Sequence, residues 1–571
     1  MEKQWDIKAP ADKTKVEELK NQLNIDETLA TLLVSRGINN FDEAKAFFRP
    51  SLYDLHNPFL MRDMERAVNR LNKAINNNER ILVYGDYDVD GTTSVALVYS
   101  YISQHYKNID YYIPDRYLEG YGVSEKGIDY AAETGCKLII ALDCGIKAVS
   151  KVDYAKKLKI DFIICDHHTP GEDLPNAVAC LDPKRENCNY PDKNLSGCGV
   201  GFKFMQAFCR VNNFQEAVLY KYLDLVAVSI ASDIVPITGE NRVLATYGLK
   251  KMNANPRMGL KSIINVANVD GKELIINDIV FKIGPRINAA GRIESGREAV
   301  ELLLSEDETF ASSLSTHINE FNETRKDLDS RITQEALEII ASSEELKNRK
   351  TTVLYNPNWH KGVIGIVASR LTETYYRPTV ILTESKGFAN GSARSVEGFD
   401  LYKAIETCSD LLENFGGHTY AAGLTIKIEN VPLFIECFEQ IVSDTILPNQ
   451  LIPKVEIDAE IAFSNITPKF YRILKQFAPF GPGNMKPVFI TCDVTDYGTS
   501  KLVGKDRSHL KLELISIHSG TIIQGVGFSL GDHIKRIKNH EVFDICYTVE
   551  ENEFNGKKSL QIMVREIRFN D

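Results

Sequence analysis

Short apolar runs without polar interruption recur between residues 81 and 181 of this 571-residue chain. The clearest lie at 81–84, 138–141 and 162–164. Such runs are typical of strands buried on both faces, as in a parallel sheet. Strands are expected at 81–86, 109–113, 138–143, 161–166 and 178–181, and helices at 92–106, 146–158, 200–211 and 217–235. The alternation predicts an α/β domain with a mostly parallel sheet and right-handed crossovers, over residues 79–296.

The pattern changes on both sides of this block. Apolar residues at helical spacing predict helices at 16–23, 29–36, 42–48 and 64–75, a helical N-terminal lead-in over 1–78. No Gly or Pro occurs from Arg297 to Tyr355, so 297–349 is expected to be a connector of one or two long helices. A second α/β domain is expected over 350–448, with strands at 351–355 and 379–383 and a helix at 362–376.

Short strand-like runs follow at 488–490, 510–515, 521–528 and 560–564, which predicts a small β-barrel of OB type over 453–571. Lys501, Lys505, Arg507 and Lys511 stand close together there, beside one acid, Asp506. A strand–turn–strand segment rich in lysine suits a groove for single-stranded nucleic acid. A merely solvated hairpin fits the same residues.

Composition narrows the class of protein. Hydrophobic residues make up 43% and charged residues 25%, as in ordinary soluble proteins. There is no apolar run of membrane-spanning length and no signal-peptide pattern, so we expect no membrane segment. The 11 cysteines are scattered, which fits the reducing cytoplasm. The net charge of −11 argues against a wholesale nucleic-acid coat but permits a local basic channel.

Acidic and histidine residues follow three of the expected strands. They are Asp86, Asp88 and Asp90 after the first, Asp143 after the third, and Asp166, His167 and His168 after the fourth. Ligands of parallel α/β sheets bind at the carboxyl ends of the strands, so these side chains should meet at one edge. Crowded carboxylates need cations, and carboxylates mixed with imidazole suit divalent Mn, Mg or Zn. Two such ions commonly cleave phosphate esters.

A calcium loop is the main alternative for the first cluster. An EF-hand loop needs a glutamate at its twelfth position and a helix before it. Here that position is Leu97, and an expected strand precedes the loop. A solvated acidic turn would explain the first cluster alone, but two adjacent histidines at another strand end favour a metal site.

The motifs Asp-Tyr-Asp-Val-Asp-Gly at 86–91, Leu-Asp-Cys-Gly at 142–145 and Asp-His-His at 166–168 resemble those of the DHH phosphoesterase superfamily. Within it the chain is similar to the RecJ family of bacterial single-strand-specific 5′→3′ DNA exonucleases. The resemblance extends to Ser-Asp-Ile-Val-Pro at 232–236, Gly-Pro-Arg-Ile-Asn-Ala-Ala-Gly-Arg at 284–292, Gly-Ser-Ala-Arg-Ser at 391–395 and Gly-Gly-His at 416–418. The second α/β block would then be the DHH-associated domain.

The resemblance implies two divalent metal ions, Mn²⁺ or Mg²⁺. One would be held by Asp86, Asp88 and Asp143, and the other by Asp90, Asp143, His167 and Asp233. It implies that His168 contacts the phosphate and that Asp166 orients the histidine pair. Smaller relatives have a histidine near the position of Asp86, so the assignment of each acid of that loop to one ion stays open. Residues implied to contact the nucleic acid are Arg116, Arg286, Asn288, Arg292, His360, Ser392, Arg394 and His418.

The function expected from the resemblance is metal-dependent, 5′→3′ hydrolysis of single-stranded DNA in DNA repair and recombination, by a cytoplasmic bacterial monomer. A single-strand-binding protein and a RecQ-type helicase are the implied partners. One rival is a DHH-family phosphodiesterase that acts on short RNA or cyclic dinucleotides. A second rival is a non-catalytic nucleic-acid-binding factor, against which the complete set of metal-motif residues argues.

Overall fold

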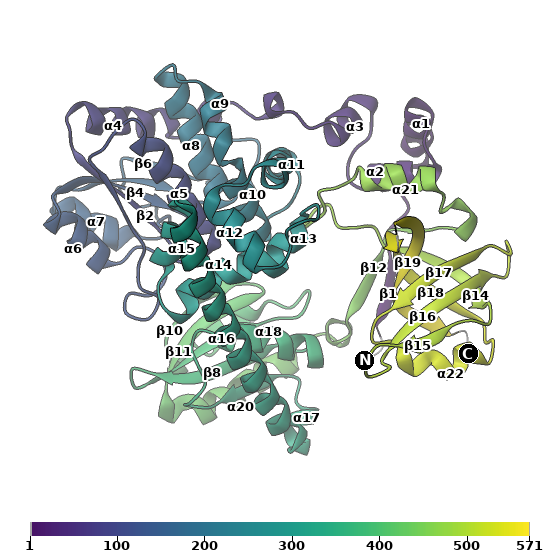
Figure 1. Cartoon of the computed structure of the whole chain (residues 1–571). Helices are drawn as coiled ribbons and strands as arrows, with labels where there is room; N and C mark the ends of the chain where they lie inside the picture. The colour runs from purple at the N-terminus through teal and green to yellow at the C-terminus, as the bar shows by residue number, and fades with distance from the viewer. Residues whose placement is uncertain (1–2, 555, 570–571) are drawn as a thin grey trace. The chain divides into compact units, whose positions relative to one another are not determined.

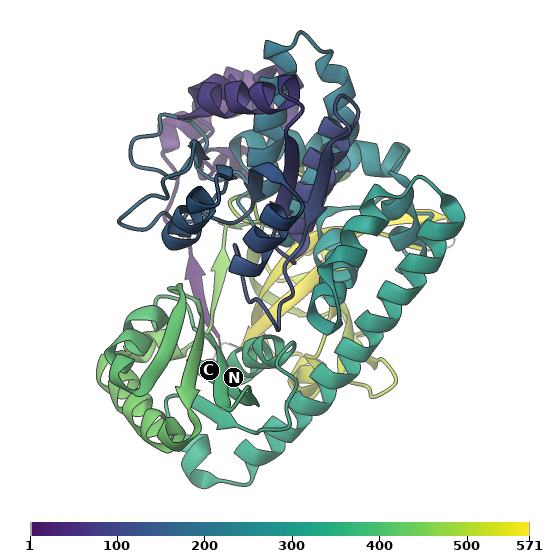
Figure 2. The same ribbon diagram turned by 90° about the vertical axis from the view of Figure 1, so that its left-hand side faces the viewer.

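The computed structural model describes residues 3–554 and 556–569, which group into two compact units. One unit holds Asn57–Asp233 and Tyr247–Pro453. The other holds Trp5–His56, Ile234–Thr246 and the chain from Lys454 onward. The first unit contains a parallel sheet and a second, mixed sheet (Figures 1 and 2). The helical lead-in is therefore divided, because residues 5–56 group with the C-terminal segment.

The parallel sheet confirms the expected α/β fold. Its strands are β2 (Arg80–Gly85), β3 (Ile109–Tyr112), β4 (Cys136–Leu142), β5 (Asp161–Cys165) and β6 (Ala179–Leu181). Their order is β3-β2-β4-β5-β6, and all neighbours are parallel. The central strands are buried on both faces, which is why their sequences do not alternate.

Helices cover both faces of this sheet (Figure 1). One face packs against α6 (Glu125–Glu133) and α7 (Val149–Lys157). The other packs against α4 (Met64–Asn76), α5 (Val89–Ser103) and α8 (Gly197–Val211), with α10 (Leu223–Ser232) lying on α5 and α8. The short α9 (Glu216–Leu219) and a 3-10 turn precede α10, so the helix expected at 217–235 is divided.

Two helices begin three residues before their expected starts because side chains cap them. Asp88 accepts a hydrogen bond from the Gly91 N–H (3.0 Å) at the start of α5. The Ser196 hydroxyl accepts one from the Gly199 N–H (3.1 Å) at the start of α8. Such caps satisfy free amides of the first turn, and they offset the low helix propensity of the glycines there.

Further helices follow the parallel sheet. They are α11 (Gly239–Ala254), α12 (Met258–Val266), α13 (Ile276–Asp278), the π-helix η4 (Ile279–Ile283), α14 (Gly284–Ile293), α15 (Gly296–Leu304), α16 (Glu308–Ala341) and α17 (Glu344–Asn348). Asp307 caps α16 through the Phe310 N–H (2.6 Å), so the connector is interrupted there. Helix α16 packs on α12, α14 and α15, and further along on α18 (Ile364–Tyr375).

The mixed sheet has the order β10-β11-β9-β8-β7, and only β7 and β8 pair in parallel. Its strands are β7 (Thr352–Tyr355), β8 (Thr379–Ser385), β9 (Phe388–Arg394), β10 (Leu412–His418) and β11 (Ala421–Lys427). Helices α19 (Leu401–Thr407) and α20 (Val431–Thr445) pack on one face. Helices α16 and α18 pack on the other.

The C-terminal segment forms an OB-like sheet. Its strands are β13 (Ala459–Glu460), β14 (Phe489–Asp496), β15 (Lys501–Val503), β16 (His509–Ser516), β17 (Ile522–Gly527), β18 (Phe543–Phe554) and β19 (Lys557–Phe569). The pairings run from β14 through β18, β19, β17 and β16, and three residue pairs return from β16 to β14. The sequence analysis did not predict β18, although its residues 545–549 form an uncharged run between Asp544 and Glu550.

The N-terminal helices complete the core of this second unit. They are α1 (Lys13–Leu23), α2 (Glu27–Val34) and α3 (Phe41–Phe48), and β1 (Gln4–Ile7) pairs with β12 (Lys454–Ile457). Leu29 and Leu32 are fully buried in one cluster with Phe470 and Leu474 of α21 (Pro468–Lys475). No helix in the described part of the chain combines the length and apolar character needed to cross a membrane.

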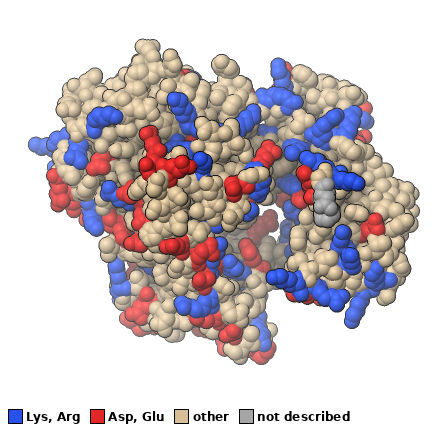
Figure 3. All heavy atoms as spheres, in the orientation of Figure 1, with Lys and Arg blue, Asp and Glu red and all other residues tan. Residues whose placement is uncertain are grey.

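Lysine and arginine side chains gather over one part of the second unit, around α22 (Ile534–Lys538) and β15 (Figure 3). Lys501 of β15 and Lys511 of β16 stand directly opposite each other in the register. Like charges facing each other across a strand pair are unfavourable unless an anion lies between them.

Candidate metal centre

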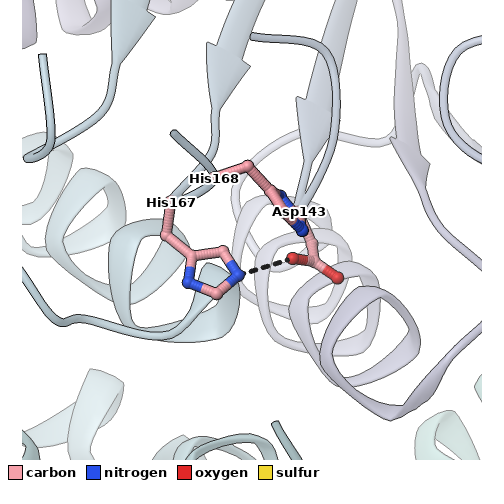
Figure 4. A group of neighbouring side chains, drawn as sticks. All are labelled: Asp143, His167 and His168. Carbon is pink, nitrogen blue, oxygen red and sulfur yellow. Dashed lines mark ion pairs between the residues drawn. The ribbon is translucent and has the colours of Figure 1, made fainter. Parts of the chain in front are cut away.

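The strand ends bring the sequence-predicted acids and histidines together. Gly85, Leu142 and Cys165 end three adjacent strands in matching register, so Asp86, Asp143 and Asp166 follow at the same edge of the sheet. The side chains of Asp143, His167 and His168 converge there (Figure 4). One possible metal-binding group consists of these three residues, and a second of Asp90, His167 and Asp233.

Asp143 lies at the centre of the site. Its backbone has a φ of +59°, a conformation unusual for a residue with a side chain, and its N–H donates to the Cys165 carbonyl (2.9 Å). Both carboxylate oxygens are buried and have no hydrogen-bond partner within residues 3–554 and 556–569, and one lies 3.2 Å from His167 Nε2. A buried carboxylate without partners is costly unless a cation binds it.

Asp90 and Asp233 approach His167 from two helices. The distances from His167 Nε2 are 3.7 Å to Asp90 Oδ2 and 3.5 Å to Asp233 Oδ2. Asp90 is held in place by the N–H groups of Gly197 (2.7 Å) and Cys198 (2.8 Å) at the start of α8. The hydroxyl of Ser229 also donates to it (2.7 Å).

Asp86 and Asp88 complete the carboxylate group. Asp86 is buried and accepts a hydrogen bond from the Gly122 N–H (3.2 Å), and its second oxygen has no partner in the part of the chain that the structure describes. Burial, and then the charge of Asp88, raises the pKa of Asp86 well above its ordinary value. Burial also raises the pKa of Asp88.

The same crowding affects the other acids. Burial, and then the charges of Asp90 and Asp88, raises the pKa of Asp143 well above its ordinary value and that of Asp233 to about 8. Without cations these groups therefore resist ionisation. Hard oxygen donors with one imidazole fit Mn²⁺ or Mg²⁺, and the unpartnered oxygens of Asp143 and Asp86 point to the same conclusion.

Asp166 holds the histidine pair. Its carboxylate accepts hydrogen bonds from the N–H groups of Ile146 (2.9 Å) and His167 (2.7 Å), and lies 2.7 Å from His168 Nδ1. Burial favours the neutral imidazole of His168, but the hydrogen bond with Asp166 and nearby carboxylates raise its pKa to about 9. Burial likewise opposes the charge on Asp166, but His168 and the Ile146 N–H lower its pKa to about 2. In the metal-free protein, Asp166 therefore favours the charged imidazole of His168.

Arg116, Arg292 and Arg394 come from three separate segments, and within the described residues none of them forms an ion pair with a carboxylate. Arg116 lies over the Tyr87 ring (5.0 Å to the centroid), and Arg292 donates to the Gly362 carbonyl (3.1 Å). Burial, then the charges of Arg116, Arg325 and Arg394, lowers the pKa of Arg292 to about 10. Clustered guanidinium groups of this kind bind anions, phosphate in particular.

Ser392 and Arg394 on β9 adjoin this arginine group. Arg394 donates to the hydroxyls of Ser392 (3.1 Å) and Ser369 (3.2 Å). His360 is half-buried, and its Nδ1 accepts a hydrogen bond from the Gly362 N–H (3.1 Å). Burial, then the charge of Arg116, lowers the pKa of His360. The structure thus brings His360, Ser392 and Arg394 to the side of Arg116.

The remaining sequence-predicted contacts have different surroundings. Arg286 donates to Asn319 (2.8 Å) on α16 and to the Lys282 carbonyl (2.7 Å), so it braces α14. Asn288 is half-buried on α14. His418 is exposed at the end of β10. Partial desolvation of its ring, and then the charges of Lys147, His168 and Lys184, lower its pKa.

Sequence reasoning missed two residues that touch the site. Ser229 binds Asp90, and its only sequence signal was its place on an apolar helix four residues before Asp233. The hydroxyl of Tyr121 lies 3.1 Å from His168 Nε2. The only sequence signal for Tyr121 was its place between two glycines, Gly120 and Gly122. In the structure both glycines have positive φ.

Three family descriptions match the chain: "DHH family, N-terminal domain" over 80–230, "DHHA1 domain" over 348–444 and "RecJ OB domain" over 457–566. The single-stranded-DNA-specific exonuclease RecJ of Bacillus subtilis is 36% identical over 564 residues, which cover 98% of this chain and 70% of the relative. Crystal structures of RecJ from Thermus thermophilus align over 100% of this chain. The complex with Mn²⁺ has a TM-score of 0.86 and 24% sequence identity, and the alignment covers 80% of that chain. The complex with Mg²⁺ has a TM-score of 0.79 and 23% sequence identity, and the alignment covers 79% of that chain.

Proposed function

Because this chain belongs to the RecJ family of single-stranded-DNA-specific exonucleases, we propose that it degrades single-stranded DNA from the 5′ end by two-metal hydrolysis. It is an exonuclease that acts on single-stranded DNA and depends on Mn²⁺ or Mg²⁺. The 5′→3′ direction and the two-ion arrangement belong to the proposal. The observation that carries it is the buried carboxylate of Asp143, which has no hydrogen-bond partner among the described residues and belongs to one of two possible ligand groups that share His167.

In this proposal Asp143 is shared by two ions. Asp86 and Asp88 hold the first with it, and Asp90, His167 and Asp233 hold the second. Divalent ions there activate water and stabilise the charge that develops on the phosphate and the leaving oxygen. Asp90 is anchored by two backbone N–H groups and a hydroxyl, so its position is fixed before any ion binds.

His168 contacts the scissile phosphate in this proposal, and Asp166 fixes the orientation of its ring. The Asp166–His168 hydrogen bond (2.7 Å) supports these roles, because it keeps the imidazole charged beside a phosphate anion. The raised pKa of His168, about 9, means that the charge is present at neutral pH.

The 5′ end would bind on the Arg116 side. Three guanidinium groups, a hydroxyl and an imidazole would suit a terminal phosphate; they belong to Arg116, Arg292, Arg394, Ser392 and His360. Arg286 would act by holding α14, which also carries Asn288 and Arg292. His418 would reach the strand from the end of β10.

The proposed division of labour follows the sequence boundaries. Residues 79–296 form the catalytic domain, 350–448 the DHH-associated domain and 453–571 a DNA-binding module. We propose a cytoplasmic monomer that works in DNA repair and recombination with a single-strand-binding protein and a RecQ-type helicase. The family resemblance supports these partners.

The test is digestion of a single strand labelled at either end, with Mn²⁺ or Mg²⁺, beside duplex and RNA controls. We expect immediate release of the 5′ label and retention of the 3′ label on shortening products. Release of the 3′ label first would contradict the direction. Cleavage of dinucleotides alone would favour a phosphodiesterase acting on short or cyclic nucleotides.

A further inference from the structure

Two exposed lysines, Lys147 and Lys184, lie at the carboxyl edge of the parallel sheet. Within residues 3–554 and 556–569, no carboxylate oxygen lies within 4.0 Å of either ammonium group. They are therefore cations without an ion pair beside a site rich in acids. Neither belongs to the residues that the proposed function uses.

Lys184 is positioned by the outermost strand of the sheet. Leu181 of β6 is in register with Cys165 of β5, and the Asp166 N–H donates to the Leu181 carbonyl (3.0 Å). The chain after β6 therefore begins beside Asp166. The buried Asp182 accepts a hydrogen bond from the Lys184 N–H (2.7 Å), which fixes the turn that presents Lys184.

Lys147 reaches the same end of the edge from the loop after β4. It follows Ile146, whose N–H donates to Asp166 (2.9 Å). Its Cγ would lie 4.0 Å from a Cβ placed on Gly171, in the loop that follows the histidine pair. Its stem therefore lies against the segment between β5 and β6.

His418 joins the two lysines from the mixed sheet. After burial, the charges of Lys147, His168 and Lys184 are what lower its pKa. Burial and nearby charged groups have larger effects on the pKa values of His167 and Asp233, but the charge of Lys184 also favours the deprotonated form of both. The two ammonium groups and the imidazole come from three separate segments, so their convergence is a tertiary feature.

The strand order separates this cluster from the arginine group. Arg116 follows β3 at one end of the order β3-β2-β4-β5-β6, and Lys184 follows β6 at the other. The proposed metal ligands Asp86, Asp143 and His167 follow β2, β4 and β5 between them. Cations thus flank the metal centre on both sides.

We propose that Lys147, Lys184 and His418 form a second phosphate-binding subsite, which holds the phosphodiester on the 3′ side of the bond being cut. This rests on the proposed function, in which the arginine group holds the 5′ phosphate and the ions hold the scissile phosphate. A strand laid along the edge in that order brings its next phosphate to the lysines. The ligand is the sugar–phosphate backbone, so the subsite is independent of base sequence.

The experiment uses single-stranded oligonucleotides in which one phosphodiester is replaced by a neutral methylphosphonate. In one substrate the second linkage from the 5′ end is neutral, and in the other a linkage far downstream is neutral. With the wild-type protein and Mn²⁺, we expect the first substrate to lose about tenfold in kcat/KM for the first cleavage, as for one charge-assisted contact. The second substrate should lose much less.

The double variant Lys147→Ala/Lys184→Ala should lose activity on the natural strand and should no longer respond to the neutral second linkage. Its salt dependence should also weaken by about 0.7 in the log–log slope, the value for one phosphate contact to a single strand. The matched control is Lys156→Ala/Lys157→Ala, two exposed lysines at the end of α7, which should behave like wild type.

Equal sensitivity of wild type and double variant to the second linkage would overturn the subsite. So would a wild-type enzyme that is indifferent to that linkage, a measurement that needs no variant. Failure of the wild type to degrade any single strand would instead overturn the proposed function.

Discussion

At the scale of single residues, Asp143 combines two unfavourable features. A φ of +59° costs about 1–3 kcal/mol for a residue other than glycine. A buried carboxylate with neither oxygen bonded adds a desolvation cost. Two divalent cations that share Asp143 as a ligand would compensate both of these costs.

Asp143→Ala should abolish hydrolysis while the fold persists, because it removes the proposed shared ligand. We expect a loss of more than about 100-fold, since even indirect supports of a metal site cost 10–100-fold. The measurement is the initial rate on single-stranded DNA, with thermal unfolding as the fold check. Asp153→Ala, at an exposed acid on α7, is the matched control. Retention of a tenth of the wild-type rate would refute the assignment.

Metal-free protein should become less stable as pH rises from about 4 to 8. The folded-state pKa values of Asp86, Asp88, Asp143 and Asp233 are raised, that of Asp233 to about 8. Each such group stabilises the fold below its unfolded pKa, and this contribution is lost as pH rises through the folded value. Mn²⁺ should therefore raise Tm more at pH 8 than at pH 5.5. An equal increment at both values would contradict the proposed ligands.

The acids and histidines after the strands could be predicted because parallel strands end at one edge. The supports of Asp90 could not be predicted. They are the N–H groups of Gly197 and Cys198 and the Ser229 hydroxyl, more than 100 residues away along the chain. Lys184 was also missed, because the sequence predicted the strand at 178–181 but not its pairing with β5 beside Asp166.

At the scale of elements, the N-terminus of α8 is the closest support of the metal centre. Ser196 caps it, its first amides bind Asp90, and Gly197 faces Asp143. The glycines at 197, 199 and 201 lower helix propensity, so the sequence predicted a later start at 200. Tertiary contacts outweigh that low propensity here, because the backbone at the start of α8 donates hydrogen bonds to Asp90 and lies against Asp143.

Gly197→Ala should impair catalysis more than stability. A Cβ there would lie 2.7 Å from the Asp143 Oδ1 and Cβ atoms, so Asp143 would have to shift. We expect kcat to fall about tenfold or more, because small misplacements of catalytic groups are costly. Gly199→Ala is the control, since its Cβ would meet Ser196 Oγ at 3.3 Å. Equal rates for the two variants would contradict this role of α8.

At the scale of the whole molecule, the second unit is assembled from distant segments. Residues 5–56 share a core with the OB-like sheet, and Arg242 donates to the carbonyls of Phe47, Phe477 and Ala478. Helix periodicity showed that the lead-in is helical, but it did not show where that helical face packs. Deleting 453–571 would expose Leu29 and Leu32, so a truncation confounds DNA binding with unfolding.

Charge removal on the intact second unit gives a cleaner test of strand binding. Lys501→Ala/Lys511→Ala removes the facing lysine pair of β15 and β16, whose repulsion an anionic strand would relieve. We expect weaker binding of long single strands, a smaller salt slope and, in the free protein, unchanged or higher Tm. Hydrolysis of a very short oligonucleotide should stay at the wild-type rate, because the proposed metal ligands lie at Asp233 or before it.

The control is Lys13→Ala/Lys15→Ala, two exposed lysines on α1 of the same unit. If short and long substrates suffer equally in the folded variant, or if the control weakens long-strand binding as much, the facing lysines are not a strand-binding surface and the hairpin is simply solvated.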